Sequence, residues 1–279
     1  MNALYNLSIF FYSILIRLTA PFNIKAKQIN KGRRQTFADL QSKIKHDRPI
    51  VWVHCASLGE FEQGRPIIEA IRKQHPGYQI LLTFFSPSGY EIRKNYDLAE
   101  YICYLPADTK KNAKKLIELV RPEMVFFVKY EFWFHYITEL KKRNIPLYLV
   151  SAIFRENQLF FKNSPWGKWY RKMLYRFEQF FVQDDHSVKL LHQVGIKDDF
   201  MLGHNRAGLL HQGAVFHLLR LEPCSNVLAR FFALCGQPCG EVWRGDVVPS
   251  YILELGRLCV GVACSVPCVL VGVSIGQIK

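Results

Sequence analysis

Strand-length apolar runs alternate with amphipathic stretches through the first 200 residues, and this order constrains the fold more than any other feature of the sequence. Six apolar runs occur, over residues 50–57, 79–85, 100–106, 124–130, 146–154 and 179–184. Amphipathic stretches of helical period follow five of them, over residues 60–74, 109–120, 132–143, 166–177 and 185–194. Continuously apolar runs predict strands that are buried on both faces of a parallel sheet, with helices on each side. We therefore expect a Rossmann-like α/β domain.

The loops that follow the first and fourth apolar runs each carry a carboxylate. Ligands of parallel sheets bind at the carboxyl ends of the strands, so Glu60 and Glu131 are expected to lie on one rim. Glu60 begins a helix, where it is either a charge favoured by the helix dipole or a general base at the mouth of a cleft. Gly59 beside it is expected to permit a tight turn. Two carboxylates are more than the fold needs at this rim, which favours a functional site.

Hydroxyl groups and a glycine follow the second apolar run. Ser86, Ser88 and Gly89 are expected either to cap the next helix or to cradle an anion at its N-terminus. The first 200 residues contain no GxGxxG, GxxxxGK[ST] or GxSxG motif. Dinucleotide-binding, P-loop NTPase and α/β-hydrolase functions therefore lose their main support.

The segment that opens the chain is uncharged from residue 3 to residue 16 and reads ALYNLSIFFYSILI. Basic residues come behind it, namely Arg17, Lys25, Lys27, Lys31, Arg33 and Arg34. A cleaved secretory signal has the reverse order. We expect a short tilted membrane anchor or an amphipathic helix in the membrane interface, with the basic cluster on the cytoplasmic face; the alternative is the buried first helix of a soluble protein.

The formal net charge of +14 favours a membrane surface or an anionic substrate as partner. Neither a zinc finger nor an arginine-rich recognition helix supports nucleic-acid binding. Only Cys55 and Cys103 of the eight cysteines lie in the first 200 residues, which is typical of a reducing compartment. The other six show no CxxC pair and no zinc-finger histidine pair, so we expect no metal site.

The composition changes sharply near residue 200. The last 79 residues hold only 10 charged residues, against 50 in the first 200, but they hold six of the eight cysteines and ten of the 17 glycines. Three explanations are open for this tail: a frameshift near residues 200–207, a natural truncation with a new module, or a membrane segment over the uncharged residues 258–275. We favour the frameshift.

Several short segments of the chain match one family's motifs in register over residues 1 to about 206. They are WVHCASLGE (Trp52–Glu60), GRR (Gly32–Arg34), YLPAD (Tyr104–Asp108), YEFW (Tyr130–Trp133), LVSA (Leu149–Ala152) and GHNR (Gly203–Arg206). This combination resembles the 3-deoxy-D-manno-octulosonic acid (Kdo) transferases of lipopolysaccharide synthesis, whose signature is WVHAASxGE. The resemblance implies a GT-B architecture, with an acceptor domain that faces a lipid A precursor and a donor domain that binds CMP-Kdo.

The resemblance also implies roles for individual residues. Glu60 would be the general base, and Glu131 and Arg206 would stabilise the transition state. Substrate-binding positions would be Ser57, Gly59, Ser86, Ser88 and Gly89. The donor substrate is CMP-Kdo, and neither a cofactor nor a metal is implied.

The chain departs from the family pattern at several of these segments. Lys129 stands where an acid is common, and Ile153 stands where LVNAR has its arginine, with Arg155 following. Ser86 and Ser88 replace threonines. Ala207 and Gly208 replace the Phe-Asp pair that would follow GHNR, and the tail shows no donor-domain motif.

We therefore expect a membrane anchor over residues 1–24, a basic linker over 25–48, an acceptor domain over 49–206 and an atypical tail over 207–279. The expected function is Kdo transfer from CMP-Kdo to lipid IVA at the cytoplasmic face of the bacterial inner membrane, by a chain that is inactive alone for lack of a donor domain. The alternatives are a non-catalytic membrane-surface protein that binds anionic lipid, and another GT-B transferase with a different nucleotide sugar.

Overall fold

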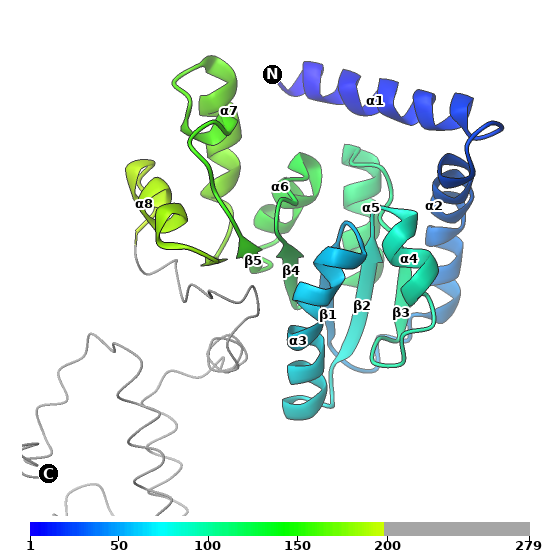
Figure 1. The fold of residues 1–279 in the computed structure, drawn as a ribbon. Coiled ribbons are helices and arrows are strands. Elements are labelled where there is room, and N and C mark those ends of the chain that lie inside the picture. The colour runs from blue at the N-terminus through cyan, green and yellow to red at the C-terminus, as the bar shows by residue number, and fades with distance from the viewer. Residues whose placement is uncertain (198–279) are drawn as a thin grey trace, which may run out of the picture. The chain divides into compact units, whose positions relative to one another are not determined.

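A computed structural model describes residues 1–197, and its centre is a six-stranded, fully parallel sheet (Figure 1). The strands are β1 (Ile50–Cys55), β2 (Gln79–Phe84), β3 (Tyr101–Tyr104), β4 (Met124–Val128), β5 (Leu147–Ala152) and β6 (Gln179–Val182). They are ordered β3-β2-β1-β4-β5-β6. This arrangement confirms the predicted Rossmann-like α/β domain, and every strand falls inside its predicted run.

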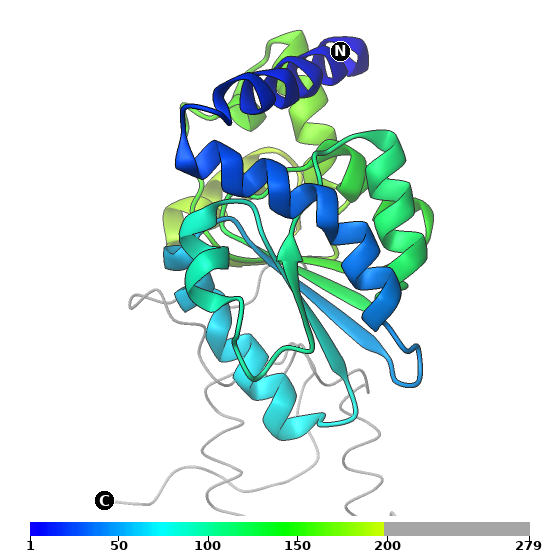
Figure 2. The ribbon, with the colours of Figure 1, turned by 90° about the vertical axis from the view of Figure 1, so that its right-hand side faces the viewer.

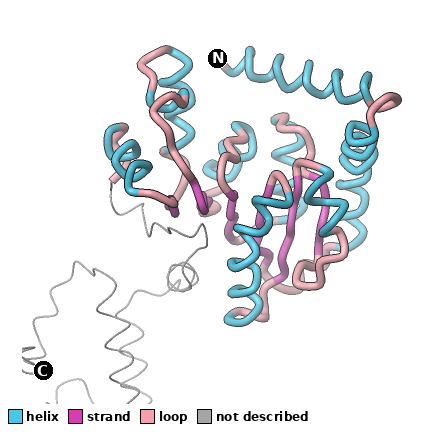
Figure 3. The backbone as a smooth tube through the Cα atoms, viewed as in Figure 1, coloured by secondary structure: helices cyan, strands magenta, loops and turns pink. Residues whose placement is uncertain are grey.

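Helices precede β1 and follow each strand (Figure 3). They are α1 (Asn2–Thr19), α2 (Ile24–Lys43), α3 (Leu58–Gln74), α4 (Pro87–Arg93), α5 (Lys110–Val120), α6 (Phe134–Lys142), α7 (Pro165–Leu174) and α8 (Asp185–Gln193), with a short 3₁₀ turn η1 (Leu159–Phe161). The five predicted helices are confirmed to within three residues at each end. Residues 25–48 were expected to form a linker, but most of them form α2. Arg206 and the tail lie outside the described residues.

The two faces of the sheet bury separate apolar clusters. Along β1, Ile50 and Trp52 point into the cluster that also contains α5 and α6, whereas Val51, Val53 and Cys55 point into the cluster beneath α3. This alternation follows from the two-residue period of a strand. Both faces are therefore covered, which explains why the runs are apolar throughout.

Helix α2 covers the cluster on the α5 face and packs against the edge strand β3 (Figure 2). Its Thr36 donates a hydrogen bond to the Tyr104 carbonyl at 2.9 Å. A Cβ atom at Gly32 would overlap the Tyr104 ring, so the first residue of the GRR segment allows close approach of the helix. The basic segment is thus a packed helix rather than a connector.

Helix α1 exposes most of its apolar side chains. Tyr5 is its only buried residue, whereas Leu4, Leu7, Phe10, Phe11, Leu15 and Leu18 are exposed. No single helix of the described region has the length and hydropathy to cross a membrane, although α1 and α2 taken together, with a bend of 117° between them, pass the same test. Helix α1 therefore does not behave as a core helix of the sheet domain.

Asp108 ties α1 to the sheet domain. Its carboxylate accepts hydrogen bonds from the backbone N–H groups of His135 (3.0 Å) and Tyr136 (3.1 Å), at the start of α6, and from the Tyr5 hydroxyl (2.5 Å). Burial raises the pKa of Asp108 to about 6, against the lowering effect of these three donors. The aspartate of the YLPAD segment thus caps one helix and anchors another.

Candidate functional site

The strand order reverses between β1 and β4, and both predicted carboxylates follow these two strands. In the sheet β1 pairs with β4, with His54 opposite Phe127. Glu60 lies in the first turn of α3, after β1, and Glu131 lies three residues beyond the end of β4. Ligands of open parallel sheets bind outside the strand ends at this switch point. The sequence-based expectation of one shared rim is therefore met by the topology.

Glu60 is half-buried and held by a single local contact. The Ser57 hydroxyl occupies the N-cap position of α3 but makes no cap bond, and instead donates to Glu60 Oε2 at 2.9 Å. The carboxylate also lies at the positive end of the helix dipole. In this arrangement the second carboxylate oxygen of Glu60 accepts no hydrogen bond from residues 1–197, and the side chain is accessible to a ligand. A carboxylate in this position can accept a proton from a bound hydroxyl group.

Glu131 is buried, with 5% of its surface exposed. Its Oε2 accepts hydrogen bonds from His54 Nε2 at 2.9 Å and from Trp133 Nε1 at 2.5 Å. Two ring N–H groups therefore fix this carboxylate in one orientation. A buried carboxylate held in this way presents a fixed negative charge to the rim.

The contacts of Glu131 continue into the sheet through a chain of side-chain hydrogen bonds. His54 is fully buried in β1, and its Nδ1 lies 2.8 Å from Thr83 Oγ1 on the neighbouring strand β2. Thr83 Oγ1 also accepts a hydrogen bond from Trp52 Nε1 at 2.8 Å. Because Nε2 of His54 faces a carboxylate, the network assigns a proton to that nitrogen. Glu131 is thus positioned by residues from two strands.

His54 and Thr83 were not predicted as site residues because both lie inside apolar runs. A signal was present: inside each of two runs, one polar residue stands between apolar neighbours. The two positions are direct partners in the β1–β2 register. Buried polar side chains of this kind are kept only where they are hydrogen-bonded.

The residues predicted around the second strand form a compact turn. Ser86 is the N-cap of α4, accepting from the Ser88 amide at 3.3 Å, and its amide donates to the Ala56 carbonyl at 2.7 Å. A Cβ atom on Gly89 would overlap the Phe84 ring and lie 3.1 Å from the carbonyl carbon of Ser57. The capping alternative for Ser86 is confirmed, whereas binding of an anion by Ser86, Ser88 and Gly89 stays a prediction.

Gly59 does not have the role expected of it. It is the second residue of α3, its φ does not lie in the left-handed region, and a Cβ atom there would meet nothing within 4 Å. The tight-turn explanation is therefore wrong. The space beside Gly59 is open, and its role in substrate binding stays a prediction.

Aromatic rings connect the rim to the N-terminal helices. Phe85 stacks on Trp133, with ring centroids 4.9 Å apart, and also lies beside Tyr12 of α1 at 5.9 Å. The Arg33 guanidinium of α2 lies over the Phe85 ring at 4.8 Å from its centroid. Phe85 thus connects Trp133, which binds Glu131, to Tyr12 of α1 and Arg33 of α2.

Two backbone conformations at the rim are unusual for non-glycine residues. Lys129, after β4, has φ 66°, and Ser151, in β5, has φ 57°. The Ser151 hydroxyl donates to Gln63 Oε1 at 2.9 Å, and Gln183 Nε2 donates to the Ser151 carbonyl at 2.8 Å. Left-handed residues of this kind persist where the surroundings determine them, often near functional sites.

The cysteines of the sheet are not part of the rim chemistry. Cys55 and Cys103 are free and buried. Burial raises the pKa of the Cys55 thiol well above its usual value and that of Cys103 to about 12. Both thiols therefore stay protonated at neutral pH. Within residues 1–197, no group of three His, Cys, Asp or Glu side chains is arranged to hold a metal ion.

A family model described as 3-deoxy-D-manno-octulosonic-acid transferase (kdotransferase) matches residues 31–205, which is more than half of the chain. The chain belongs to the Kdo transferase family. This membership confirms the resemblance predicted from the motifs, and it identifies the chain as a member of a glycosyltransferase family.

Curated Kdo transferases match this family member over part of their length. The protein from Aquifex aeolicus (strain VF5) is 34% identical over 113 residues, which are 40% of this chain and 30% of the relative. The protein from Rickettsia felis is 28% identical over 193 residues, which are 67% of this chain and 40% of the relative. The chain thus spans well under half the length of these Kdo transferases.

Among solved structures, a UDP-N-acetylglucosamine 2-epimerase from Listeria monocytogenes, described as putative, is similar over 55% of this chain and 44% of its own. The TM-score is 0.43 and the sequence identity is 12%.

Proposed function

We propose that the protein acts in the transfer of Kdo from CMP-Kdo to a lipid A precursor, lipid IVA, and that the described domain binds and activates this acceptor. The observation that carries the proposal is the pair of rim carboxylates in unlike environments: Glu60 is half-buried and reachable, and Glu131 is buried and fixed. Family membership supports Kdo as the transferred sugar.

The two carboxylates have separate parts in the proposed reaction. Glu60 takes the proton of the acceptor hydroxyl as that oxygen bonds to the anomeric carbon of Kdo, while the bond from this carbon to the CMP phosphate breaks and CMP leaves. The Ser57 hydroxyl orients Glu60 through its 2.9 Å hydrogen bond. Positive charge develops on the sugar in such a transition state, and the fixed charge of Glu131 stabilises it. Arg206, outside the described residues, is proposed to stabilise the transition state as well.

The acceptor side of the site suits an anionic amphiphile. The exposed apolar side chains of α1 favour contact with a membrane surface, and the basic residues of α1 and α2 favour anionic headgroups. We propose that the protein works at the cytoplasmic face of the inner membrane, with α1 as its anchor.

Acceptor binding and sugar transfer are tested separately on the purified full chain. We expect saturable binding of lipid IVA that the Glu60→Gln variant retains within about twofold, because the substitution removes a proton acceptor but little contact area. Failure of the chain to bind lipid IVA would contradict the acceptor-domain proposal.

Transfer is measured with CMP-Kdo by mass spectrometry of the lipid. We propose that this chain alone gives no CMP-dependent product, because the segment that matches the family corresponds to the acceptor side. Product formation that Glu60→Gln abolishes would overturn this part of the proposal and would establish Glu60 as the base.

The exposed apolar face of α1 also favours a second candidate, a membrane-surface protein that binds anionic lipid without catalysis. Vesicle sedimentation separates the two functions. The second candidate predicts binding to any anionic vesicle with no preference for lipid IVA, whereas the acceptor proposal predicts that lipid IVA competes with other anionic lipids for the domain.

A further inference from the structure

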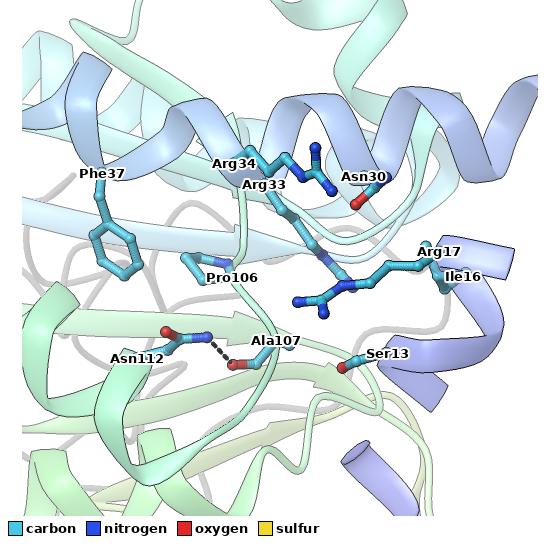
Figure 4. Close-up of a pocket in the computed structure, with 10 residues that line it drawn as sticks. All are labelled: Ser13, Ile16, Arg17, Asn30, Arg33, Arg34, Phe37, Pro106, Ala107 and Asn112. Carbon is cyan, nitrogen blue, oxygen red and sulfur yellow. Dashed lines mark hydrogen bonds between the residues drawn. The ribbon is translucent and has the colours of Figure 1, made fainter. Parts of the chain in front are cut away.

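A cavity of about 280 Å³ lies between α1, α2 and the loop that joins β3 to α5 (Figure 4). Its walls include three arginines, Arg17 at the end of α1 and Arg33 and Arg34 on α2. The remaining lining residues are small, apolar or amide-bearing: Ser13, Ile16, Asn30, Phe37, Pro106, Ala107 and Asn112. Cavities that bind small ligands begin near this size, at about 300 Å³.

The charge of this cavity is uncompensated. No Asp or Glu is among its lining residues, and none of the three arginines forms an ion pair with a carboxylate of residues 1–197. Figure 4 shows the Arg17 and Arg33 side chains converging from different helices. Because like charges repel, such convergence raises the free energy of the domain unless an anion binds between them.

The Arg33 guanidinium is held in place, but not all of its N–H groups have a hydrogen-bond acceptor among the described residues. Its Nε donates to the Leu105 carbonyl at 3.0 Å, and its guanidinium lies between the rings of Phe85 (4.8 Å) and Tyr12 (5.7 Å). Its Nη2 is buried and has no hydrogen-bond partner among the described residues. A buried charged donor without an acceptor is costly, so this atom favours a ligand that brings an acceptor oxygen.

We propose that the three-arginine cavity binds the phosphoryl group of a phosphomonoester. A phosphomonoester carries a charge of about −1.5 to −2 at neutral pH and three acceptor oxygens. It therefore offsets more of the three positive charges than a carboxylate or a phosphodiester, each of which carries one negative charge. The planar guanidinium fork also matches phosphate oxygens in bidentate geometry.

The surroundings of the cavity indicate a ligand with an apolar part. Leu15 and Leu18 flank Arg17 on α1 and are exposed by 58% and 66%. On the other side, Arg33 contacts Phe85, which stacks on Trp133, the residue that binds Glu131. A phosphorylated amphiphile in the cavity would thus reach toward both the apolar face of α1 and the rim. Its identity as the acceptor rests on the proposed function, whereas the cavity's preference for phosphomonoesters does not.

The test compares binding of the full chain to vesicles of phosphatidylcholine that contain phosphatidic acid, a phosphomonoester, or phosphatidylglycerol, a phosphodiester, at equal surface charge. We expect tighter binding to phosphatidic acid. The double variant Arg17→Gln/Arg34→Gln should lose this preference, with affinity for phosphatidic acid falling by about tenfold or more. The variant Lys25→Gln/Lys31→Gln removes the same charge from exposed positions of α2 outside the cavity and should lose less than about threefold.

Two further arms make the outcome decisive. The variant Arg17→Lys/Arg34→Lys keeps the positive charges but removes the two planar guanidinium groups, so it should bind both lipids equally. Circular dichroism confirms that this variant is folded. Inorganic phosphate is added as a competitor: release of the protein indicates a site for soluble phosphate esters as well, and retention indicates a lipid headgroup. Equal binding of the wild-type chain to both lipids, or equal losses in the two neutralised variants, would overturn the cavity as a site. Because no sugar transfer is measured, that result leaves the proposed function standing.

Discussion

Glu60 and Glu131 lie at the ends of adjacent parallel strands, but their side chains are held by different kinds of contact. Glu60 is held by a residue at the start of its own helix, whereas Glu131 is held in part by a residue from a distant segment of the chain. Glu60 is half-buried and is contacted by Ser57, three residues before it. Glu131 is 5% exposed and is contacted by His54, from a strand 77 residues earlier in the chain, and by Trp133. The rim therefore carries two glutamates in different states: Glu60 is accessible to a ligand, and Glu131 is fixed by its hydrogen bonds.

This difference matters for chemistry because a base and a stabilising charge have opposite needs. A base must meet its substrate and accept a proton, so it requires access. A stabilising charge must not move as the reaction proceeds, so it requires bonds to groups that are themselves held. The environments of Glu60 and Glu131 correspond to these two needs, and the difference between them should appear in the stability of variants.

The largest expected effect is the loss of stability in Glu131→Ala. The substitution leaves the buried N–H groups of His54 and Trp133 without their acceptor, so the free energy of unfolding should fall by about 4 kcal/mol. Urea denaturation of the full chain, followed by tryptophan fluorescence, measures this.

Glu60→Ala is the matched control, because it removes the same carboxylate from the same rim. We expect a change within about 0.5 kcal/mol, since its contact with Ser57 is local and half-exposed. Equal losses in the two variants would show that the contrast between the carboxylates is not real.

A second prediction uses Asp108, a carboxylate that is buried like Glu131 but faces hydrogen-bond donors at a helix start. Its folded-state pKa of about 6 lies above the value of about 3.9 in unfolded chains, so the folded state binds more protons between these values. The Asp108 contribution to the free energy of unfolding should therefore be fully present below pH 4 and decrease by about 3 kcal/mol as the pH rises through 6.

Asp108→Asn isolates this contribution, because it removes the titrating group and keeps an acceptor oxygen. The difference in unfolding free energy between the wild type and the variant, measured from pH 4 to pH 7, should follow the Asp108 titration. A difference that does not change with pH would contradict the raised pKa.

The third prediction compares two glycines in the first turns of helices at the rim, Gly59 in α3 and Gly89 in α4. Gly89→Ala places a methyl group against Phe84 and the Ser57 backbone, and it should lower the unfolding free energy by about 2 kcal/mol. Gly59→Ala meets open space in the first turn of α3 and should raise it by about 0.5 kcal/mol, because alanine favours a helix. Thermal melts of both variants give the signs, and destabilisation by Gly59→Ala would restore a conformational role for that glycine.

A smaller loss of stability than that of Gly89→Ala is expected one step further from the rim. Thr83→Val keeps the shape of the side chain but deprives Trp52 Nε1 of its acceptor, so the unfolding free energy should fall by about 1 kcal/mol. Thr83→Ser keeps the hydroxyl and should retain the hydrogen bonds to Trp52 and His54. If the valine and serine variants have equal unfolding free energies, the series of hydrogen bonds from Trp52 to Glu131 does not pass through Thr83.

Much of the fold could be predicted because periodicity is a local property. Each strand lies inside a predicted apolar run, and the starts of α5 and α8 coincide with the capping residues Thr109 and Asp184. Segment 25–48 was not predicted as a helix because its apolar residues are few. Its helix is stabilised by the fit of Gly32 and Thr36 against Tyr104, a contact across about 70 residues that no local pattern contains.

The sequence by itself determined the alternation of strands and helices, the parallel sheet and the placement of Glu60 and Glu131 at strand ends, since these follow from residue order and side-chain periodicity. Only the tertiary structure decided that Glu131 is buried against His54, that Asp108 joins α1 to α6, and that Arg17 and Arg33 converge. The reason is physical: burial, hydrogen-bond partners and charge proximity depend on which distant segments pack together, and those contacts form only when the sheet and its helices assemble.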